Sequence, residues 1–447
     1  MDADTELETQ IDQWRGYVQR HRSISAADVE EMEGHLRDRV ADLTDAGLSV
    51  DEAFLIAVKR IGNVDEISRE FAREHSDRLW NQLVLMPATP DGDSGPRREL
   101  MVVLALAVAA ALTIRVGIAT LDDLTVVRNA PLLVLPYLAG YFAWKRQVTP
   151  RLAAVAVVPF ALAAVVLNVY PFEREGSTEV LAIIHAPIAL WFAVGFMYVG
   201  GEWRSDRRRM DFIRFTGEWF VYLTLLALGG GVLLALTVNA FLTLDIDIES
   251  AIGSWIVPMG AAGATVVAAW LVEAKQNVVE NIAPVLTRVF TPLTIVMMIA
   301  LLAAFATVHS VIDVDRDLLI LMDLILVLVV GLLLYAISAR DAQVPAQAFD
   351  WLQLGLVISA IVVDLLALTA MFIRIAELGS TPNKVTALGV NLILLVNLAW
   401  SVRLLVEFLR KRRGFGSLER WQTQYLPVYG AWAAVVVLLV PPIFGFV

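Results

Sequence analysis

Two long apolar runs near the end of the chain constrain its fold more than any other feature. Residues 352–373 and 385–406 are each long enough, at ~1.5 Å rise per residue, to cross a ~30 Å hydrocarbon core as a helix. A polar hairpin, residues 374–384, separates the runs, and the cationic cluster RKRR, residues 410–413, follows the second one. Because Lys and Arg are enriched in cytoplasmic segments, this cluster predicts a cytoplasmic end and places the hairpin outside.

The composition indicates that many such runs share one chain. Of 447 residues, 58% are hydrophobic, a larger share than soluble domains carry. We therefore predict an all-α fold, a polytopic membrane helix bundle of about eleven transmembrane helices with an N-terminal cytoplasmic four-helix domain. The second span is short, which leaves the count open by one. The predicted spans are residues 100–119, 130–143, 152–170, 179–200, 215–241, 252–272, 289–310, 318–338, 351–373, 385–406 and 425–447.

The distribution of Lys and Arg tests this threading. With the N-terminus inside, 18 of these residues beyond residue 85 fall in cytoplasmic segments and 5 in external ones. This bias follows the positive-inside rule. The polar, acidic start of the sequence predicts no cleavable signal peptide. We therefore expect a multi-pass protein of the plasma (inner) membrane, with its N-terminus in the cytoplasm and its C-terminus outside.

Residues 1–85 form a distinct, acidic segment. They carry 10 Lys and Arg against 19 Asp and Glu, a net charge of −9, which argues against direct nucleic-acid binding. Four apolar stripes at helical spacing predict a four-helix cytoplasmic domain. Residues 86–98, rich in Pro, Gly, Asp and Ser, predict a flexible linker, and residues 99–447 the transmembrane domain. One of the stripes consists of Val29, Met32, Leu36, Val40 and Leu43.

Two parts of the sequence resemble known families. The stretch HLRDRVADLTDAGLSVDEAFLIAVKRIG, residues 35–62, resembles the permease prefix module, also described as a helical signalling domain associated with helix-turn-helix regulators. The run FTGEWFVYLTLLAL from Phe215 onward, the hairpin of residues 374–384 and the last two spans resemble a widespread uncharacterised family of bacterial multi-pass membrane proteins. The first resemblance implies a regulatory module without chemistry of its own, and the second implies architecture only.

Enzyme signatures are scarce in this chain. No G-x-x-x-x-G-K-[ST] phosphate loop, H-E-x-x-H zinc helix or G-x-S-x-G elbow occurs, and there is no cysteine. Five histidines are scattered without metal-ligand spacing. The triplet Asp313, Asp315 and Asp317 begins like a calcium loop, but Leu318 stands where that loop requires glycine. We predict no catalytic residue, no cofactor and no metal site, and the chain is not expected to be an enzyme.

Polar side chains inside the spans carry the strongest functional signal, because a charge at bilayer depth costs ~2.5–3.5 kcal/mol on insertion scales. Several lie in the outer halves of their spans, where we predict an outward-facing polar cavity. Asp364 and Arg115 lie at the same depth, so we expect them to pair, with Asp323 as the alternative partner of Arg115. Hydrogen bonds that merely hold the bundle together explain such residues equally well. The cavity candidates are Arg115, Asn168, His185, His309, Asp323 and Asp364.

A basic inner surface faces the acidic domain in this topology. We predict that the domain docks there; the alternative is that these cations serve topology alone. Residues 273–288 place several apolar side chains on one helical face, which predicts a helix lying in the membrane interface, whereas Pro284 favours the first turn of the next span. The candidate docking residues are Arg204, Arg207, Arg208, Arg209, Arg214 and Lys275.

Two functions from different classes fit these features. The first is a regulatory or sensory membrane protein, in which the cytoplasmic domain is coupled to a transmembrane bundle with an outward-facing polar cavity. The second is a secondary transporter or channel with a regulatory N-terminal domain. The expected partners are the lipid bilayer, a cytoplasmic regulatory protein or another membrane subunit, and a second copy of the chain in a homo-oligomer.

Overall fold

The computed structural model of the chain describes residues 11, 26–45, 50, 53, 54, 57, 95–244, 246, 248–274, 282–305 and 316–447. The chain divides into two compact units, Met1–Asp93 and Ser94–Val447. Every regular element in the described ranges is a helix, which confirms the predicted all-α class.

The first unit contains α2 (Ala26–Asp45). Leu36 and Val40 from the predicted apolar stripe are buried. Glu33 and Arg37, one turn apart on the same helix, form an ion pair at 2.9 Å. The predicted first and fourth helices of this unit lie outside the described residues, except for one buried side chain. The other described core residues of the unit are Ile11, Ala53 and Ala57.

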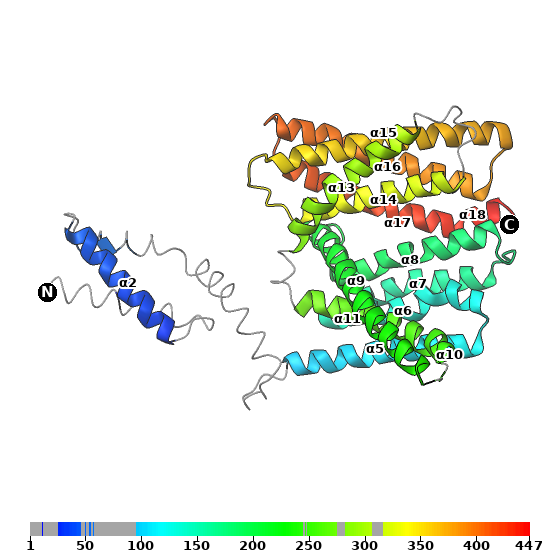
Figure 1. Cartoon of the computed structure of the whole chain (residues 1–447), viewed down its shortest axis with the longest axis horizontal. Coiled ribbons are helices and arrows are strands. Elements are labelled where there is room, and N and C mark those ends of the chain that lie inside the picture. The colour runs from blue at the N-terminus through cyan, green and yellow to red at the C-terminus, as the bar shows by residue number, and fades with distance from the viewer. Residues whose placement is uncertain are drawn as a thin grey trace. The chain divides into compact units, whose positions relative to one another are not determined.

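The second unit is a bundle of long apolar helices (Figure 1). Ten helices in the described ranges are long and apolar enough to cross a membrane. The chain is therefore a multi-pass membrane protein. The elements are α5 (Gly95–Thr120), α6 (Asp123–Lys145), α7 (Pro150–Val169), α8 (Ser177–Tyr198), α9 (Asp206–Leu242), α10 (Glu249–Ala251), η1 (Ile252–Ile256), α11 (Val257–Ala274), α13 (Ile282–Phe305), α14 (Arg316–Ser338), α15 (Ala348–Leu378), α16 (Pro382–Leu409), α17 (Gly416–Leu438) and α18 (Val440–Ile443).

The start of α5 lies inside the predicted linker. The helix begins at Gly95, so it includes the last residues of the segment 86–98. Pro96 is compatible with this start, because a proline in the first helical turn has a suitable φ and needs no amide donor.

The second span, α6, is longer than predicted. The expected run 130–143 is only the apolar part of a helix that begins at Asp123. Asp122 caps this helix: its carboxylate accepts hydrogen bonds from the amide and the hydroxyl of Thr125, at 3.3 and 2.7 Å. The added turns contain Arg128 and Asn129. Arg128 donates to Glu179 on α8 and Asn129 to Asn168 on α7, so both polar side chains have partners inside the bundle.

The last predicted span, 425–447, is displaced in the structure. The helix α17 runs from Gly416 to Leu438, and its polar first turns keep it out of the ten apolar helices. It nevertheless packs against α8, α9 and α16, so it belongs to the bundle. After α18 the chain closes on the loop between α7 and α8, where the carbonyls of Phe446 and Val447 accept from the amides of Glu173 and Thr178 at 2.9 and 2.7 Å.

The helix α9 differs from its neighbours because its buried residues all lie in its first third. It spans 37 residues, and Figure 1 shows it crossing the other helices obliquely. Phe212 and Phe215 pack among the aromatic rings of α6 and α8, including Phe142 and Tyr198. Among its residues none after Glu218 is buried.

Residues 282–288 do not form a separate interfacial helix. They are the first turns of α13, which starts at Ile282 and continues into the span, as the alternative based on Pro284 predicts. Residues 275–281 of that segment, and residues 306–310 at the predicted end of the span, lie outside the described residues.

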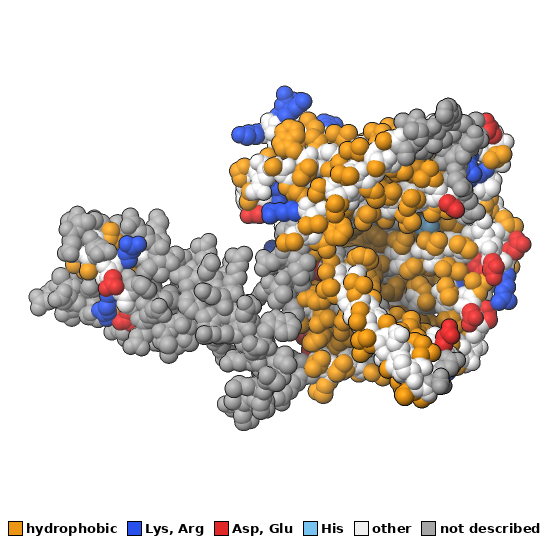
Figure 2. Space-filling view, in the orientation of Figure 1, with side chains coloured by type: hydrophobic (Ala, Val, Ile, Leu, Met, Phe, Trp, Pro, Cys, Tyr) orange, Lys and Arg blue, Asp and Glu red, His pale blue; other side chains and the backbone are white. Residues whose placement is uncertain are grey.

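The two ends of the bundle carry different charges. Figure 2 shows Lys and Arg side chains mainly at one end and Asp and Glu mainly at the other. The basic end collects the loops that follow α6, α8, α14 and α16. Arg146, for example, donates to the carbonyl of Tyr198 and to Glu273. This arrangement fits alternating spans, while the assignment of the basic end to the cytoplasm stays a prediction.

Candidate functional site

Two carboxylates meet inside the helix bundle. Asp364 on α15 is fully buried, and neither of its oxygens has a hydrogen-bond partner. Asp323 on α14 is half-buried and lies close enough to Asp364 for the two side chains to interact electrostatically. The helices α14 and α15 pack directly on each other.

A side-chain amide completes this group. Asn391 on α16 is fully buried and faces Asp323, yet neither its oxygen nor its nitrogen makes a well-formed hydrogen bond. The helix α16 packs on both α14 and α15, so three adjacent helices each contribute one polar residue. We call Asp323, Asp364 and Asn391 the acid site.

The acid site has the chemistry of a proton-binding group. Two ionised carboxylates in a low-dielectric interior repel each other, and each also loses hydration. A single proton removes one charge and supplies one hydroxyl donor. An amide can then donate to the remaining carboxylate or accept from the protonated one. The side-chain polar atoms of Asp364 and Asn391 have no hydrogen-bond partner, so they are available for either arrangement.

The predicted pair of Arg115 and Asp364 does not form. Arg115 lies on α5, which packs against α6 and α11. Its guanidinium stacks over the ring of Trp255, 4.1 Å from the ring centre, and its Nε has no hydrogen-bond partner. A cation–π contact of this kind stabilises the charge of the guanidinium group. The prediction had paired that charge with a carboxylate because both residues lie at the same depth in their spans. Within the described ranges, Arg115 makes no ion pair with Asp323 either.

The other cavity candidates have separate surroundings. Asn168 on α7 exchanges two hydrogen bonds with Asn129 on α6, at 3.0 and 2.8 Å. His185 bonds through Nδ1 to the carbonyl of Leu181 in its own helix, at 2.8 Å. His309 lies outside the described residues. Of the six candidates, the described structure brings Asp323 and Asp364 together.

Sequence reasoning missed a buried ion pair between α6 and α8. Arg128 donates to Glu179, and the amide of Glu175 donates to the second oxygen of that carboxylate at 2.9 Å. The predicted spans 130–143 and 179–200 leave Arg128 just outside its span and Glu179 at the first position of its own. The capping pattern of Asp122 and Thr125 was the available signal, because it starts α6 early enough to place Arg128 inside the helix.

The predicted docking residues divide into bonded and free groups. Arg208 pairs with Glu202 at 3.1 Å, and Arg209 with Asp206. Arg214 donates to the carbonyl of Ser338, the last residue of α14. The remaining candidates are Arg204 and Arg207, which are exposed and have no hydrogen bond or ion pair with a described residue, and Lys275, which lies outside the described residues.

A polar pocket of about 260 Å³ opens at the same basic end. It is lined by charged groups of both signs, and its wall includes the buried carboxylate of Glu218. Nearby arginines are held by neighbouring groups, so the pocket is a preformed polar recess. Its charged lining residues are Arg146, Arg208, Asp211, Arg214 and Glu218.

Comparison of the chain with protein-family models, curated proteins and solved structures found no match.

Proposed function

We propose that this chain is a regulatory or sensory membrane protein whose acid site takes up a proton. The observation that carries the proposal is the state of Asp364: it is fully buried between membrane helices, beside a second carboxylate, and both its oxygens lack partners. A polar group buried in this way has a large cost unless something neutralises it. A proton does so without requiring any further ligand.

Proton uptake at this position has a direct structural effect. Asp323, Asp364 and Asn391 lie on three different helices, so the hydrogen bonds that form with the proton link α14, α15 and α16 to one another. When the proton leaves, two carboxylates repel each other across the contact between α14 and α15. The packing of these helices therefore differs between the two protonation states.

The N-terminal unit is the proposed output of this change. Its resemblance to permease prefix and helical signalling modules supports a regulatory role, and it contains a helix with a buried apolar face. A cytoplasmic regulatory protein or a second membrane subunit would receive the signal, in the plasma membrane with this unit inside the cell. The same design is compatible with a homo-oligomer.

A secondary transporter is the second candidate. The polar pocket at the basic end favours it, because a recess lined by charged groups of both signs can accept ions. A transporter that carries protons would use the acid site as its binding site. The two candidates share the acid site but differ in whether the proton crosses the membrane.

The test measures proton binding and proton flux in the same preparation. The full chain is purified and examined by infrared spectroscopy for a protonated carboxyl group that titrates with pH, and in proteoliposomes for dye-reported proton flux. Asp364→Asn, Asp323→Asn and the double variant are compared with Asp341→Asn, a control in an exposed loop.

The proposal expects a titrating carboxyl signal that Asp364→Asn removes and Asp341→Asn preserves, without flux. Flux that disappears in Asp364→Asn establishes the transporter instead. A carboxyl signal unchanged in the double variant excludes the acid site in both roles.

A further inference from the structure

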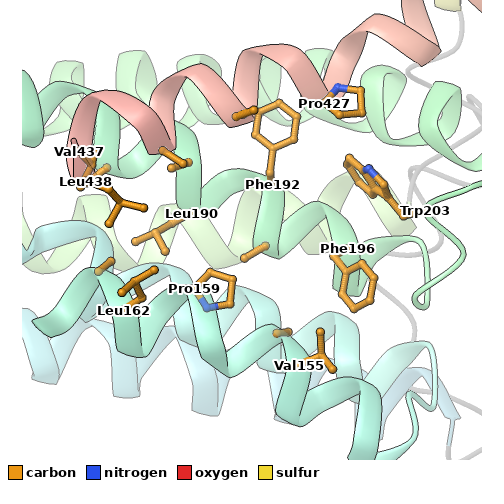
Figure 3. Close-up of a pocket in the computed structure, with 18 residues that line it drawn as sticks. Val155, Pro159, Leu162, Leu190, Phe192, Phe196, Trp203, Pro427, Val437 and Leu438 are labelled. Atoms are coloured by element: carbon orange, nitrogen blue, oxygen red, sulfur yellow. The ribbon is translucent and has the colours of Figure 1, made fainter. Parts of the chain in front are cut away.

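An apolar groove lies between the helices α7, α8 and α17. Its volume is about 410 Å³, and none of the 18 described residues that line it is charged. Figure 3 shows Pro159 and Leu162 on one wall and Phe192, Val437 and Leu438 on the other, with the side chains directed toward the space between the helices.

The groove exists because its walls are built from small and rigid residues. Eight of the 18 lining residues are Ala or Gly, and proline interrupts the walls at Pro159 and Pro427. Gly430 is required where α17 meets α8, since a Cβ there would lie 2.7 Å from the ring of Phe192. Larger side chains at these positions would fill the space.

The groove is open to the bilayer. Val155 and Leu162, on α7, are 56% and 46% exposed. These residues belong to a membrane span, so the medium that reaches them is the acyl region of the membrane. A hydrocarbon chain is the occupant that this lining accepts, because it leaves no polar group unpaired.

Two free cations mark the basic end of the same groove. Arg151 lies one helical turn before Val155, on the same face of α7, and Arg204 directly follows the lining residue Trp203. Both arginines are exposed, and neither has a hydrogen bond or an ion pair with a described residue.

The two arginines are brought to one place by a contact between the loop and α7. Gly201, in the loop that carries Arg204, lies against Leu152, the neighbour of Arg151; a Cβ at Gly201 would be 2.9 Å from the Leu152 side chain. The adjacent Trp203 packs on Phe192 of the groove wall, with ring centres 6.1 Å apart. Arg151 and Arg204 therefore lie on two segments that contact each other at the mouth of the groove.

We infer that this groove binds one acyl chain of an anionic phospholipid, with the headgroup phosphate held by Arg151 and Arg204. An apolar lining with exposed residues on α7 and two unpaired cations at the basic end together fit this ligand. Guanidinium groups form paired hydrogen bonds with phosphate oxygens, which fixes the headgroup above the chain.

The test counts lipids retained by the full-length protein in native mass spectrometry. Protein stripped of lipid in detergent is titrated with phosphatidylglycerol, and separately with phosphatidylcholine of the same acyl composition. The expected result is one tightly held phosphatidylglycerol per chain and weaker retention of phosphatidylcholine. In Arg151→Gln/Arg204→Gln the affinity for phosphatidylglycerol is expected to fall roughly thirtyfold, on the basis of two arginine contacts with an anionic lipid.

Two further variants separate the headgroup from the groove. Arg410→Gln/Arg412→Gln removes two exposed cations at the same basic end and should leave retention unchanged. Ala189→Phe places a large ring into the groove and should abolish retention even though both arginines remain. Thermal unfolding in detergent confirms that each variant is folded.

Four results would overturn the inference. One is equal retention of the two lipids by the wild-type protein. Another is loss of binding in the Arg410/Arg412 control to the same extent as in Arg151→Gln/Arg204→Gln. The third is glycerol phosphate binding as tightly as the lipid, which would make the acyl groove irrelevant; a lipid-free dimer that Ala189→Phe dissociates would likewise assign the groove to a second copy of the chain.

Discussion

Arg128 on α6 and Glu179 on α8 form an ion pair inside the bundle, with side chains that are 16% and 2% exposed. We expect Glu179→Gln or Arg128→Gln to destabilise the protein by about 3 kcal/mol, because each leaves the partner charge buried alone. The double variant Arg128→Met/Glu179→Leu should be more stable than either single variant. Thermal unfolding in detergent measures the difference.

The control for this pair is Arg174→Gln. Arg174 contacts Asp122 at 3.6 Å, but both side chains are exposed, so its loss should change stability little. A double variant as unstable as the sum of its two single variants would show that Arg128 and Glu179 act independently.

The amides of Asn129 and Asn168 join α6 to α7 by two reciprocal hydrogen bonds. We expect a double-mutant cycle of Asn129→Ala and Asn168→Ala to give a coupling energy of about 0.6 kcal/mol, with an upper bound near ~1.7 kcal/mol. Asn239 is the matched control, because its amide bonds only to the carbonyl of Ala235 in its own helix. Coupling between Asn168 and Asn239 as large as that between Asn168 and Asn129 would contradict the prediction.

Gly389 on α16 allows the ring of Trp432 on α17 to approach the backbone. A Cβ at Gly389 would lie within 2.0 Å of that ring, so Gly389→Ala should separate the two helices and cost roughly 1–3 kcal/mol or more. Gly229→Ala is the control: nothing lies within 4 Å of a Cβ at that position on α9. Melting temperatures in detergent should therefore fall for the first substitution and stay constant for the second.

The N-terminal unit is expected to fold on its own. Leu36 and Val40 are buried within it, and Met1–Asp93 is a compact unit. The excised unit should show a cooperative thermal transition by circular dichroism. A gradual loss of helix signal with temperature would mean that the unit needs the rest of the chain.

We also expect this acidic unit to dock on the exposed arginines of the basic end. Arg204 and Arg207 are the suitable residues, since Arg208, Arg209 and Arg214 already have partners. Crosslinks between the unit and this loop should weaken as salt rises, because such contacts are screened over ~8–10 Å at physiological ionic strength. Arg204→Glu/Arg207→Glu should abolish them, whereas Arg410→Glu/Arg412→Glu should not. Absence of crosslinks at low salt would refute docking.

Apolar runs were sufficient to predict the helical class and most spans. The predicted bounds of the spans were wrong where polar side chains bond to partners on other helices. The run 130–143 excluded Arg128 and Asn129, because hydropathy counts each as exposed although partners on other helices satisfy them. In α17 the buried amide of Gln422 bonds to Asn397 at 3.0 Å, so a polar first half is tolerated inside the bundle.

The candidate site could be predicted only in part. The sequence marks Asp323 and Asp364 as unusual, because carboxylates rarely lie within apolar spans. The pattern of apolar runs does not reveal which spans are neighbours. The prediction therefore paired Asp364 with Arg115 only because the two lie at the same depth. That arginine instead lies on Trp255, a partner available only once η1 has packed beside α5. Arg340 is a second example. The sequence shows it only as one of the cations in a predicted cytoplasmic loop, whereas in the structure it also donates two hydrogen bonds, of 2.9 and 3.0 Å, to Asp350.

We expect the oblique course of α9 to make the protein responsive to the thickness of its membrane. A helix of 37 residues is roughly 55 Å long, well beyond a hydrocarbon core of ~30 Å. Its first third is anchored among aromatic rings, while the two thirds after Glu218 have no buried residue. A helix held at one end accommodates a thinner bilayer by tilting further and a thicker one by standing more upright. Bilayer thickness is therefore expected to act as a mechanical load on the C-terminal part of α9, and the rings of Phe212 and Phe215 would receive it.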